Sequence, residues 1–314
     1  MTMGMDVKQA ARRFAATILA SLPKGLFTDT QFFELYQSRG WHATPVHFYL
    51  PIPDTSELSE RHWEAPSRMV GIDDNIDAQC ALLAGFARSG YLGEYERIVE
   101  AAAGGTHLNS GQFGGMDGAI LYAMVRNYKP GRIVEIGSGQ STLIALKALE
   151  RNGAENRAGT LTAIEPFPQD FLKRALREGD ELIVEKVQNV PMETFERLAD
   201  NDILFIDSTH VAKIGSDVLY EINEILPRLK EGVIVHVHDI FLPYEYPREW
   251  VMNRHVFWNE QYLVQAFLAF NKAFQITYSA GLMRQMRPEQ LAGEFAYFDR
   301  AQPQAGSLWI RRVG

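Results

Sequence analysis

The spacing of apolar residues changes character near residue 110. Before that point apolar positions recur at helical intervals and predict helices over about 7–21, 29–38, 72–88 and 94–102. The clearest is 72–88, behind two aspartates in its first turn, where one face carries Ile72, Ile76, Cys80, Leu83 and Ala87. Residues 1–110 are therefore expected to form a mainly helical N-terminal region.

Beyond residue 111 short apolar runs alternate with helical patterns. Strands are expected over 132–136, 160–164, 181–187, 202–206, 232–237, 274–279 and 307–312, and helices over 141–149, 169–178, 218–229 and 259–270. Strands that are apolar throughout are buried on both faces of a parallel sheet. The pattern predicts a doubly wound α/β domain over 111–314, in which ligands bind beyond the carboxyl ends of the strands.

Composition and charge narrow the functional classes. The chain has 314 residues, with 31 basic against 39 acidic side chains, a net charge of −8. This balance offers no basic face for duplex nucleic acid. The single cysteine, Cys80, rules out an internal disulfide and a cysteine-based metal cage. We therefore expect no nucleic-acid partner.

The N-terminal stretch over 7–22 combines basic and apolar residues, as a signal peptide does. Its apolar residues recur at helical spacing, however, and no small-residue cleavage site follows. An amphipathic helix is the better interpretation, and no apolar run is long enough to cross a bilayer. We expect a cytoplasmic protein with no membrane partner.

A glycine-containing turn, Glu135-Ile-Gly137-Ser138-Gly139, follows the first predicted strand. The glycines allow a tight turn and let a ligand approach the main chain. A dinucleotide-binding turn would carry Gly or Ala where this chain has Thr142, and Glu135 would repel a pyrophosphate. These residues disfavour an NAD-dependent oxidoreductase and predict a cationic or neutral ligand.

Glu165 ends the second predicted strand. A carboxylate at this position can accept hydrogen bonds from both hydroxyls of a ribose. A solvated glutamate at a strand end is the plain alternative, but the turn one strand earlier favours a binding role.

With these residues in place, 111–314 resembles the class I S-adenosylmethionine-dependent methyltransferases. More narrowly it looks like the bacterial small-molecule O-methyltransferases of sugar and natural-product pathways. The resemblance rests on the turn at 135–139, Ile-Glu165-Pro, Leu-Phe-Ile-Asp207 and the final strand pair, which looks like that fold's antiparallel edge hairpin. Ser141 departs from the pattern, because many members carry a third glycine there.

The resemblance implies a seven-stranded Rossmann-like methyltransferase sheet, with the N-terminal helical region over 1–110 as a cap. It also implies an S-adenosylmethionine site, with Gln188 or Asn189 near the adenine. The residues expected to bind this cosubstrate are Glu135, Gly137, Ser138, Gly139, Glu165, Gln188 and Asp207.

Two further strand ends carry polar residues suited to catalysis. Asp207 and His210 follow the fourth predicted strand, and His238 and Asp239 end the fifth. Neighbouring strand ends should place all four in one cleft, as catalytic residues. Transfer of a methyl group to a hydroxyl requires removal of its proton, by a histidine base or with the help of a metal. Helix capping is the alternative role for Asp207, and His236 is interpreted as a core residue.

The resemblance also implies a metal ion. Metal-dependent O-methyltransferases imply a divalent ion such as Mg²⁺ held by Asp207 and Asp239. Those enzymes usually carry Asn or a second Asp after the fifth-strand acid, where this chain has Ile240. His210 or His238 would have to supply the missing ligand.

The segment over 239–250 contains two prolines and several aromatic residues and is expected to be ordered but not helical. Its aromatic side chains either stack on a flat or sugar-like acceptor or pack against helices. They are Phe241, Tyr244, Tyr246 and Trp250.

The leading functional interpretation is methylation of a hydroxyl on a small-molecule acceptor. A second is another reaction on the same cosubstrate, either transfer of its aminocarboxypropyl chain or cyclisation of that chain. A third is a nucleotide-binding module without catalysis. The sequence leaves open the identity of the acceptor and whether the chain forms a homo-oligomer.

Overall fold

The computed structural model describes residues 3–23, 25–101, 113–295 and 305–314. The chain forms two compact units, 1–60 and 61–314. The first contains three helices, α1 (Met3–Ser21), α2 (Gly25–Thr28) and α3 (Phe33–Ser38). The predicted helices over 7–21 and 29–38 correspond to α1 and α3, and the second unit contains the predicted sheet.

The sheet has seven strands in the order β3-β2-β1-β4-β5-β7-β6. All pairs are parallel except those made by β7, which runs antiparallel between β5 and β6. The strands are β1 (Arg132–Ile136), β2 (Thr160–Ile164), β3 (Glu181–Ile183), β4 (Ile203–Ile206), β5 (Ile234–Val237), β6 (Phe274–Ser279) and β7 (Leu308–Arg312). The predicted Rossmann-like architecture is confirmed, with β3 shorter than expected.

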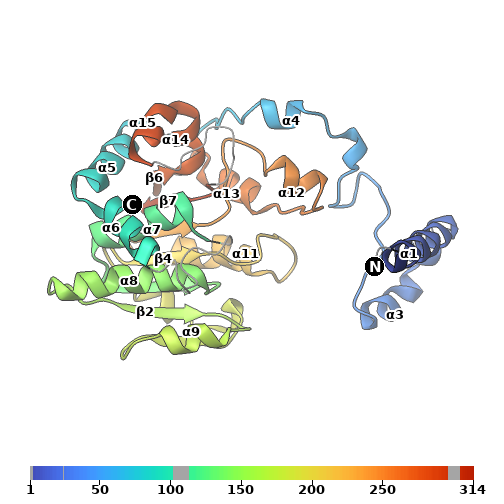
Figure 1. Ribbon diagram of the computed structural model, residues 1–314, viewed down its shortest axis with the longest axis horizontal. Helices are drawn as coiled ribbons and strands as arrows, with labels where there is room; N and C mark the ends of the chain where they lie inside the picture. Colours follow the sequence, from blue (N-terminus) through green and yellow to red (C-terminus); the bar gives the residue numbers. More distant parts are fainter. Residues whose placement is uncertain (1–2, 24, 102–112, 296–304) are drawn as a thin grey trace. The chain divides into compact units, whose positions relative to one another are not determined.

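Helices cover both faces of this sheet (Figure 1). Alternate residues along β1 enter different cores, Ile133 on one face and Val134 on the other. The first core is completed by α5 (Ile76–Arg88), α6 (Tyr91–Ala101), α7 (Gly115–Tyr128) and α8 (Gln140–Ala154). The second is completed by helices that include α11 (Asp217–Tyr220) and α13 (Glu260–Leu268). Burial on both faces is why the central strands are apolar throughout.

Helix α7 has no counterpart among the predicted elements. Ten of its fourteen residues are buried, so its apolar residues do not repeat with the period of a surface helix. Gly115 and Gly118 in its first turn further weaken the helical signal. The helix was missed because it is buried nearly all round.

Several other boundaries differ from the sequence prediction. The helix expected over 218–229 is α11 followed by a π-helical turn, Glu221–Ile225, and a 3₁₀ turn, Leu226–Arg228. The segment expected to be non-helical over 239–250 enters a short helix, α12 (Arg248–Met252), after its last proline. The remaining helices are α4 (Arg61–Glu64), α9 (Asp170–Ala175), α10 (Glu193–Glu196), α14 (Ala280–Met286) and α15 (Pro288–Glu294). Within the described ranges, no helix has the length and apolarity needed to span a bilayer.

The outer edge of β6 is covered by polar side chains at the start of α5. Asn75 donates its Nδ2 to the carbonyl of Ile276 at 2.9 Å. The main-chain N–H of Ser279 donates to Oε1 of Gln79 at 2.7 Å, and Gln79 is fully buried. These amides satisfy main-chain groups that an edge strand otherwise leaves unpaired.

The turn after β1 is packed directly on the end of β4. The N–H of Asp207 donates to the carbonyl of Ile136 at 2.9 Å, and the N–H of Gly137 donates to that of Ile164 at 3.0 Å. Gly137 has a φ of +78°, and a Cβ placed there would lie 1.8 Å from the carbonyl oxygen of Asp207. The turn therefore requires glycine at this position.

We expect Gly137→Ala to lower the free energy of unfolding by about 3 kcal/mol or more, because it adds both backbone strain and a main-chain clash. The matched control is Gly153→Ala within α8, where a Cβ meets no atom within 4 Å. That change should be neutral or stabilise the protein by up to about 1 kcal/mol. Urea unfolding of both variants without ligand measures the difference, and similar values for the two would contradict this account of the turn.

Candidate functional site

A cavity of about 360 Å³ lies at the carboxyl ends of the parallel strands. It contains four of the residues that the sequence nominated for the cosubstrate, Gly137, Glu165, Gln188 and Asp207. Its lining is Ile136, Gly137, Ile164, Glu165, Pro166, Phe167, Lys186, Val187, Gln188, Asp207, Ser208, Thr209, Lys213, Gly215, Ser216 and Asp217. This is the location that the strand order of a doubly wound sheet specifies for a ligand.

Glu165 links the turn after β1 to the loop after β2. Its Oε2 atom accepts from the N–H of Ser138 at 3.3 Å, and its Oε1 atom accepts from the N–H of Phe167 at 2.8 Å. Because both partners are main-chain groups, the carboxylate is held at the cavity wall by the backbone.

Glu135 lies beneath the turn and is not among the residues that line the cavity. It is 1% exposed and accepts hydrogen bonds from the hydroxyls of Ser141, at 2.7 Å, and Thr142. Burial raises its pKa to about 7, against the opposing effect of these hydrogen bonds. Thr142 also accepts from the N–H of Gly139 at 3.0 Å. The expected contact residues Glu135, Ser138 and Gly139 thus lie in or below the turn, and Glu135 fastens the start of α8.

Sequence reasoning missed two cations and an aromatic side chain in the cavity wall. Lys186 and Lys213 both line it, and Phe167 beside Glu165 is 81% exposed. Lys186 lies two residues before Gln188, so the reasoning that placed Gln188 after the third strand also applies to it. Lys213 comes from a loop without a recognisable pattern. Gln188 donates its Nε2 to the carbonyl of Gly215 at 3.0 Å. Asn189, the alternative to Gln188, instead donates to Glu185.

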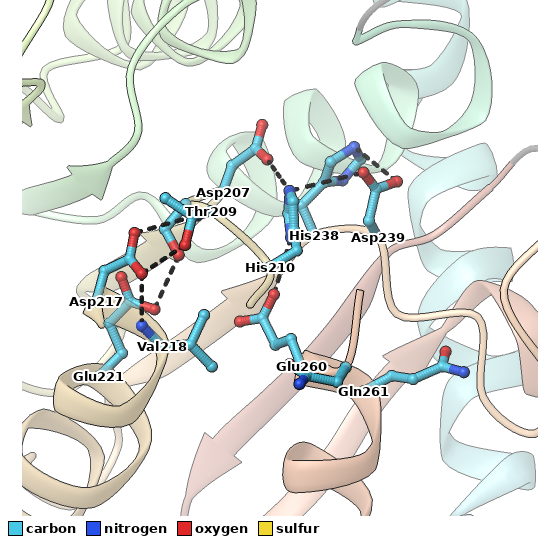
Figure 2. A network of polar contacts seen from close by, with 12 residues as sticks. Asp207, Thr209, His210, Asp217, Val218, Glu221, His238, Asp239, Glu260 and Gln261 are labelled. Carbon is cyan, nitrogen blue, oxygen red and sulfur yellow. Dashed lines mark hydrogen bonds and ion pairs between the residues drawn. The ribbon is translucent and has the colours of Figure 1, made fainter. Parts of the chain in front are cut away.

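The four nominated catalytic residues lie together beyond β4 and β5, with Asp207, His238 and Asp239 around His210 (Figure 2). The Nε2 atom of His210 lies 3.3 Å from Oδ1 of Asp207 and 3.8 Å from Oδ2 of Asp239. Its Nδ1 atom lies 2.8 Å from Oε2 of Glu260. Glu260, at the start of α13, was not nominated from the sequence. Asp207 belongs both to this cluster and to the cavity wall, so the two sites share a carboxylate.

The carboxylates stabilise a positive charge on His210. Burial opposes the charged form, but hydrogen bonds to Asp207 and Glu260 outweigh it and raise the pKa of His210 to about 10. Burial also acts to raise the pKa of Asp207, and the neighbouring His238 and His210 more than offset it, so this pKa is lowered. For Asp239, whose backbone has a φ of +54°, burial prevails and the pKa is raised.

His238 is as buried as His210 and pairs with Asp239 at 3.6 Å, from Nε2 to Oδ1. Burial lowers its pKa, but Asp207, Asp239 and Asp117 together raise the pKa above its ordinary value. Asp117 is a second residue missed from the sequence, because it lies in the unpredicted helix α7. It is buried and accepts from the N–H of Gly306 at 3.1 Å and from the Ser307 hydroxyl.

His236 is a core residue, as interpreted from its position two residues before His238. It is fully buried, and its ring stacks on Phe205 with the centroids 4.2 Å apart. Burial lowers the pKa of His236 well below its usual value. It is therefore a neutral side chain beneath the site.

The cluster as arranged does not fit a metal ion. The Nε2 atom of His210 lies 3.3 Å from Asp207 and 3.8 Å from Asp239, so an ion bound by both carboxylates would have to displace these contacts. Within the part of the chain that the structure describes, no three His, Cys, Asp or Glu side chains are grouped so as to hold an ion.

The aromatic residues of 239–250 divide into two that are buried and two that are half-buried. Phe241 and Tyr246 are 4% and 2% exposed, and the Tyr246 hydroxyl accepts from the N–H of Gln261 at 3.0 Å. These two pack the core and offer no face to an acceptor. Trp250 remains half-buried and meets Trp258, which lies 4.3 Å from the His210 ring between centroids. Tyr244 is also half-buried.

Comparison with known proteins identifies a family match and a sequence relative. Residues 134–240 match the family model described as Methyltransferase domain. An uncharacterized protein of Archaeoglobus fulgidus is 34% identical over 173 residues, which are 51% of this chain and 75% of that protein.

Two solved structures of methyltransferases are similar to the chain in fold, at low sequence identity. The O-methyltransferase from Bacillus cereus in complex with SAH is 13% identical, with 72% of this chain and 91% of that chain covered and a TM-score of 0.37. The SAH-bound Podospora anserina methyltransferase PaMTH1 is 18% identical, with 71% and 88% covered and a TM-score of 0.37.

The match over 134–240 defines the class of protein as a methyltransferase that uses S-adenosylmethionine, and the seven-stranded sheet is consistent with that class. The chain belongs to the Methyltransferase domain family, within the class I S-adenosylmethionine-dependent methyltransferases.

The raised pKa of Glu135 has a consequence for stability. A carboxyl whose pKa rises from 4.5 to about 7 on folding contributes stability below pH 4.5 and loses it as pH rises toward 7. Between pH 4.5 and pH 8 we therefore expect the unfolding free energy of the wild type to fall by about 3 kcal/mol relative to Glu135→Gln. Urea unfolding at both pH values measures this change. Other titrating groups are common to the two proteins, so a difference independent of pH would refute the assignment.

Proposed function

We propose that the chain transfers the methyl group of S-adenosylmethionine to a hydroxyl of a small metabolite, such as a sugar or a natural product, with His210 as the base. The observation that carries this proposal is the position of the His210 Nε2 atom, between Asp207 and Asp239 and next to the cavity that Asp207 also lines. A base must lie beside the methyl donor to take a proton as the new bond forms.

The cavity suits a ligand with charges of both signs. Glu165, Asp207 and Asp217 supply negative charge, and Lys186 and Lys213 supply positive charge. S-adenosylmethionine carries a sulfonium, an ammonium and a carboxylate, so each charge has a partner of opposite sign in the wall. In the proposed arrangement Glu165 accepts from the ribose hydroxyls, and the sulfonium lies toward Asp207.

The chemical step then balances within this arrangement. The acceptor oxygen attacks the methyl carbon, the carbon–sulfur bond breaks in line, and S-adenosylhomocysteine leaves. The hydroxyl proton passes to Nε2 of His210, where Asp207 and Asp239 stabilise the imidazolium. Asp239 and His238 complete the charge balance beneath the base.

His210 must be neutral before it can accept this proton. Its raised pKa means that most of it is charged at neutral pH. A cationic cosubstrate beside Asp207 competes for that carboxylate and disfavours the imidazolium. We infer that binding of the donor helps to convert His210 into a base.

The ribose role of Glu165 predicts a loss of affinity. We expect Glu165→Ala to weaken the binding of S-adenosylhomocysteine by about 1–3 kcal/mol, the range for hydrogen bonds to a charged group. Asp170→Ala is the control, because that carboxylate on α9 is 84% exposed and does not line the cavity. Calorimetric titration of both variants tests the role, which is refuted if they bind alike.

The reaction itself is tested by incubating the protein and S-adenosylmethionine with cell extract. We expect one compound to gain the mass of a methyl group, S-adenosylhomocysteine to accumulate, and turnover to rise between pH 7 and pH 9 as His210 loses its proton. His210→Asn should lower the rate by a factor of about 100 or more and leave donor binding nearly unchanged. Release of methylthioadenosine would indicate aminocarboxypropyl transfer instead, and binding without turnover would indicate a non-catalytic module.

A further inference from the structure

The start of α13 holds the segment that carries His210. The main-chain N–H groups of Asn259 and Glu260 donate to the carbonyl of His210 at 3.1 and 3.3 Å. The Asn259 side chain accepts from the N–H of Ala212 at 2.6 Å and donates to its carbonyl at 3.3 Å. Because both main chain and side chains take part, residues 210–212 are tied to α13 at several points.

His210 adopts an unusual backbone conformation, which these contacts maintain. Its φ is +59°, in the left-handed region that residues other than glycine rarely occupy. Such conformations persist where the surrounding structure enforces them, and they cluster at functional sites. The ring is also confined, since Trp258 lies against it. The remaining motion of the side chain is a rotation of the imidazole ring about the bond that joins it to Cβ.

The contact with Glu260 restricts this ring rotation. The Oε2 atom of Glu260 lies 2.8 Å from Nδ1 of His210, and a carboxylate can only accept in that contact. Asp207 also faces the ring, but its Oδ1 atom lies 3.3 Å from Nε2, whereas Glu260 lies 2.8 Å from Nδ1. The shorter contact assigns the proton of a neutral His210 to Nδ1, which leaves the lone pair on Nε2. Without this acceptor, either nitrogen could carry the proton and the ring could turn over.

Burying the carboxylate of Glu260 costs free energy unless partners compensate for the lost contact with water. Its side chain is 1% exposed, and its Oε1 atom has no hydrogen-bond partner among the residues that the structure describes. Burial and the nearby Glu260 carboxylate raise the pKa of Glu221 well above its ordinary value, and the Oε1 atom of Glu221 is similarly unpartnered. An uncharged side chain would avoid these penalties. The contact with His210 supplies this buried carboxylate with a partner that can carry a positive charge.

We propose that Glu260 is a positioning residue that fixes the tautomer and the orientation of His210, so that Nε2 is the basic atom presented to the acceptor hydroxyl. This inference rests on the proposed function, in which His210 is the base. It extends the site from the ends of β4 and β5 to α13, a helix that follows β5 in the chain.

The test compares Glu260→Gln and Glu260→Asp with Glu245→Gln. Glu245 is a matched control, because it accepts from Gln261 and Tyr262 on the same helix and does not contact His210. We expect Glu260→Gln to lower kcat on the order of 100-fold with KM for S-adenosylmethionine within about twofold. Glu260→Asp keeps the carboxylate and should recover part of the loss, and Glu245→Gln should stay within about twofold of the wild type.

A spectroscopic readout separates positioning from a general loss of structure. In protein labelled with ¹⁵N-histidine and saturated with S-adenosylhomocysteine, the ring signals of His210 are assigned by their loss in His210→Asn. At a pH above the His210 pKa of about 10, where the ring is neutral, we expect the wild type and Glu245→Gln to show the proton on Nδ1, and Glu260→Gln to show a changed distribution between Nδ1 and Nε2. Unchanged His210 signals in Glu260→Gln would overturn the inference, whatever happens to stability.

The two proposals fail in different ways. If the wild type yields no methylated product in any extract, the hydroxyl methyltransferase assignment is refuted. If product forms and Glu260→Gln retains wild-type kcat, the assignment stands and the role of Glu260 is refuted.

Discussion

The site depends on the hydrogen-bonded pairing of β4 with β1 on one side and β5 on the other. The register aligns Ile136, Ile206 and Val237, so the residues that follow them, Gly137, Asp207 and His238, emerge side by side. Parallel strands end at one edge of a sheet, and this edge therefore collects polar groups from three distant parts of the sequence. These groups lie at the end of an apolar layer, where an unpaired charge costs free energy. The positive charge of His210 is paired with the negative charges of Asp207 and Asp239.

Much of this arrangement could be predicted because strands and their ends leave a local signal. The runs around Ile133, Leu161, Leu204 and Val235 are apolar because both sheet faces are covered. The polar residues directly after them then identify the site edge. The same logic located Glu165 and Asp207, which the structure brings to one cavity. The role of Glu135 was less accessible, because its position in the strand does not reveal that its carboxylate lies beneath the turn.

Two of the residues that sequence reasoning missed, Asp117 and Glu260, have no such signal. Asp117 lies in a helix buried nearly all round, where periodicity disappears. Glu260 begins a helix whose N-terminal glutamate has an ordinary explanation in the helix dipole. Its contact with His210 spans 50 residues of sequence and depends on how α13 packs against the loop after β4. Side-chain contacts of this range are set by tertiary packing, which a local pattern does not record.

The amides that cover β6 have a consequence for association with other molecules. Asn75 and Gln79 already occupy main-chain groups on the outer side of this strand. Another β-strand could extend the sheet there only after displacing them, and at the opposite end β3 offers just three residues. Growth of the sheet by lateral addition, the route to fibrillar aggregates, is thus obstructed at both margins. Any self-association of this enzyme would have to use helical or loop surfaces.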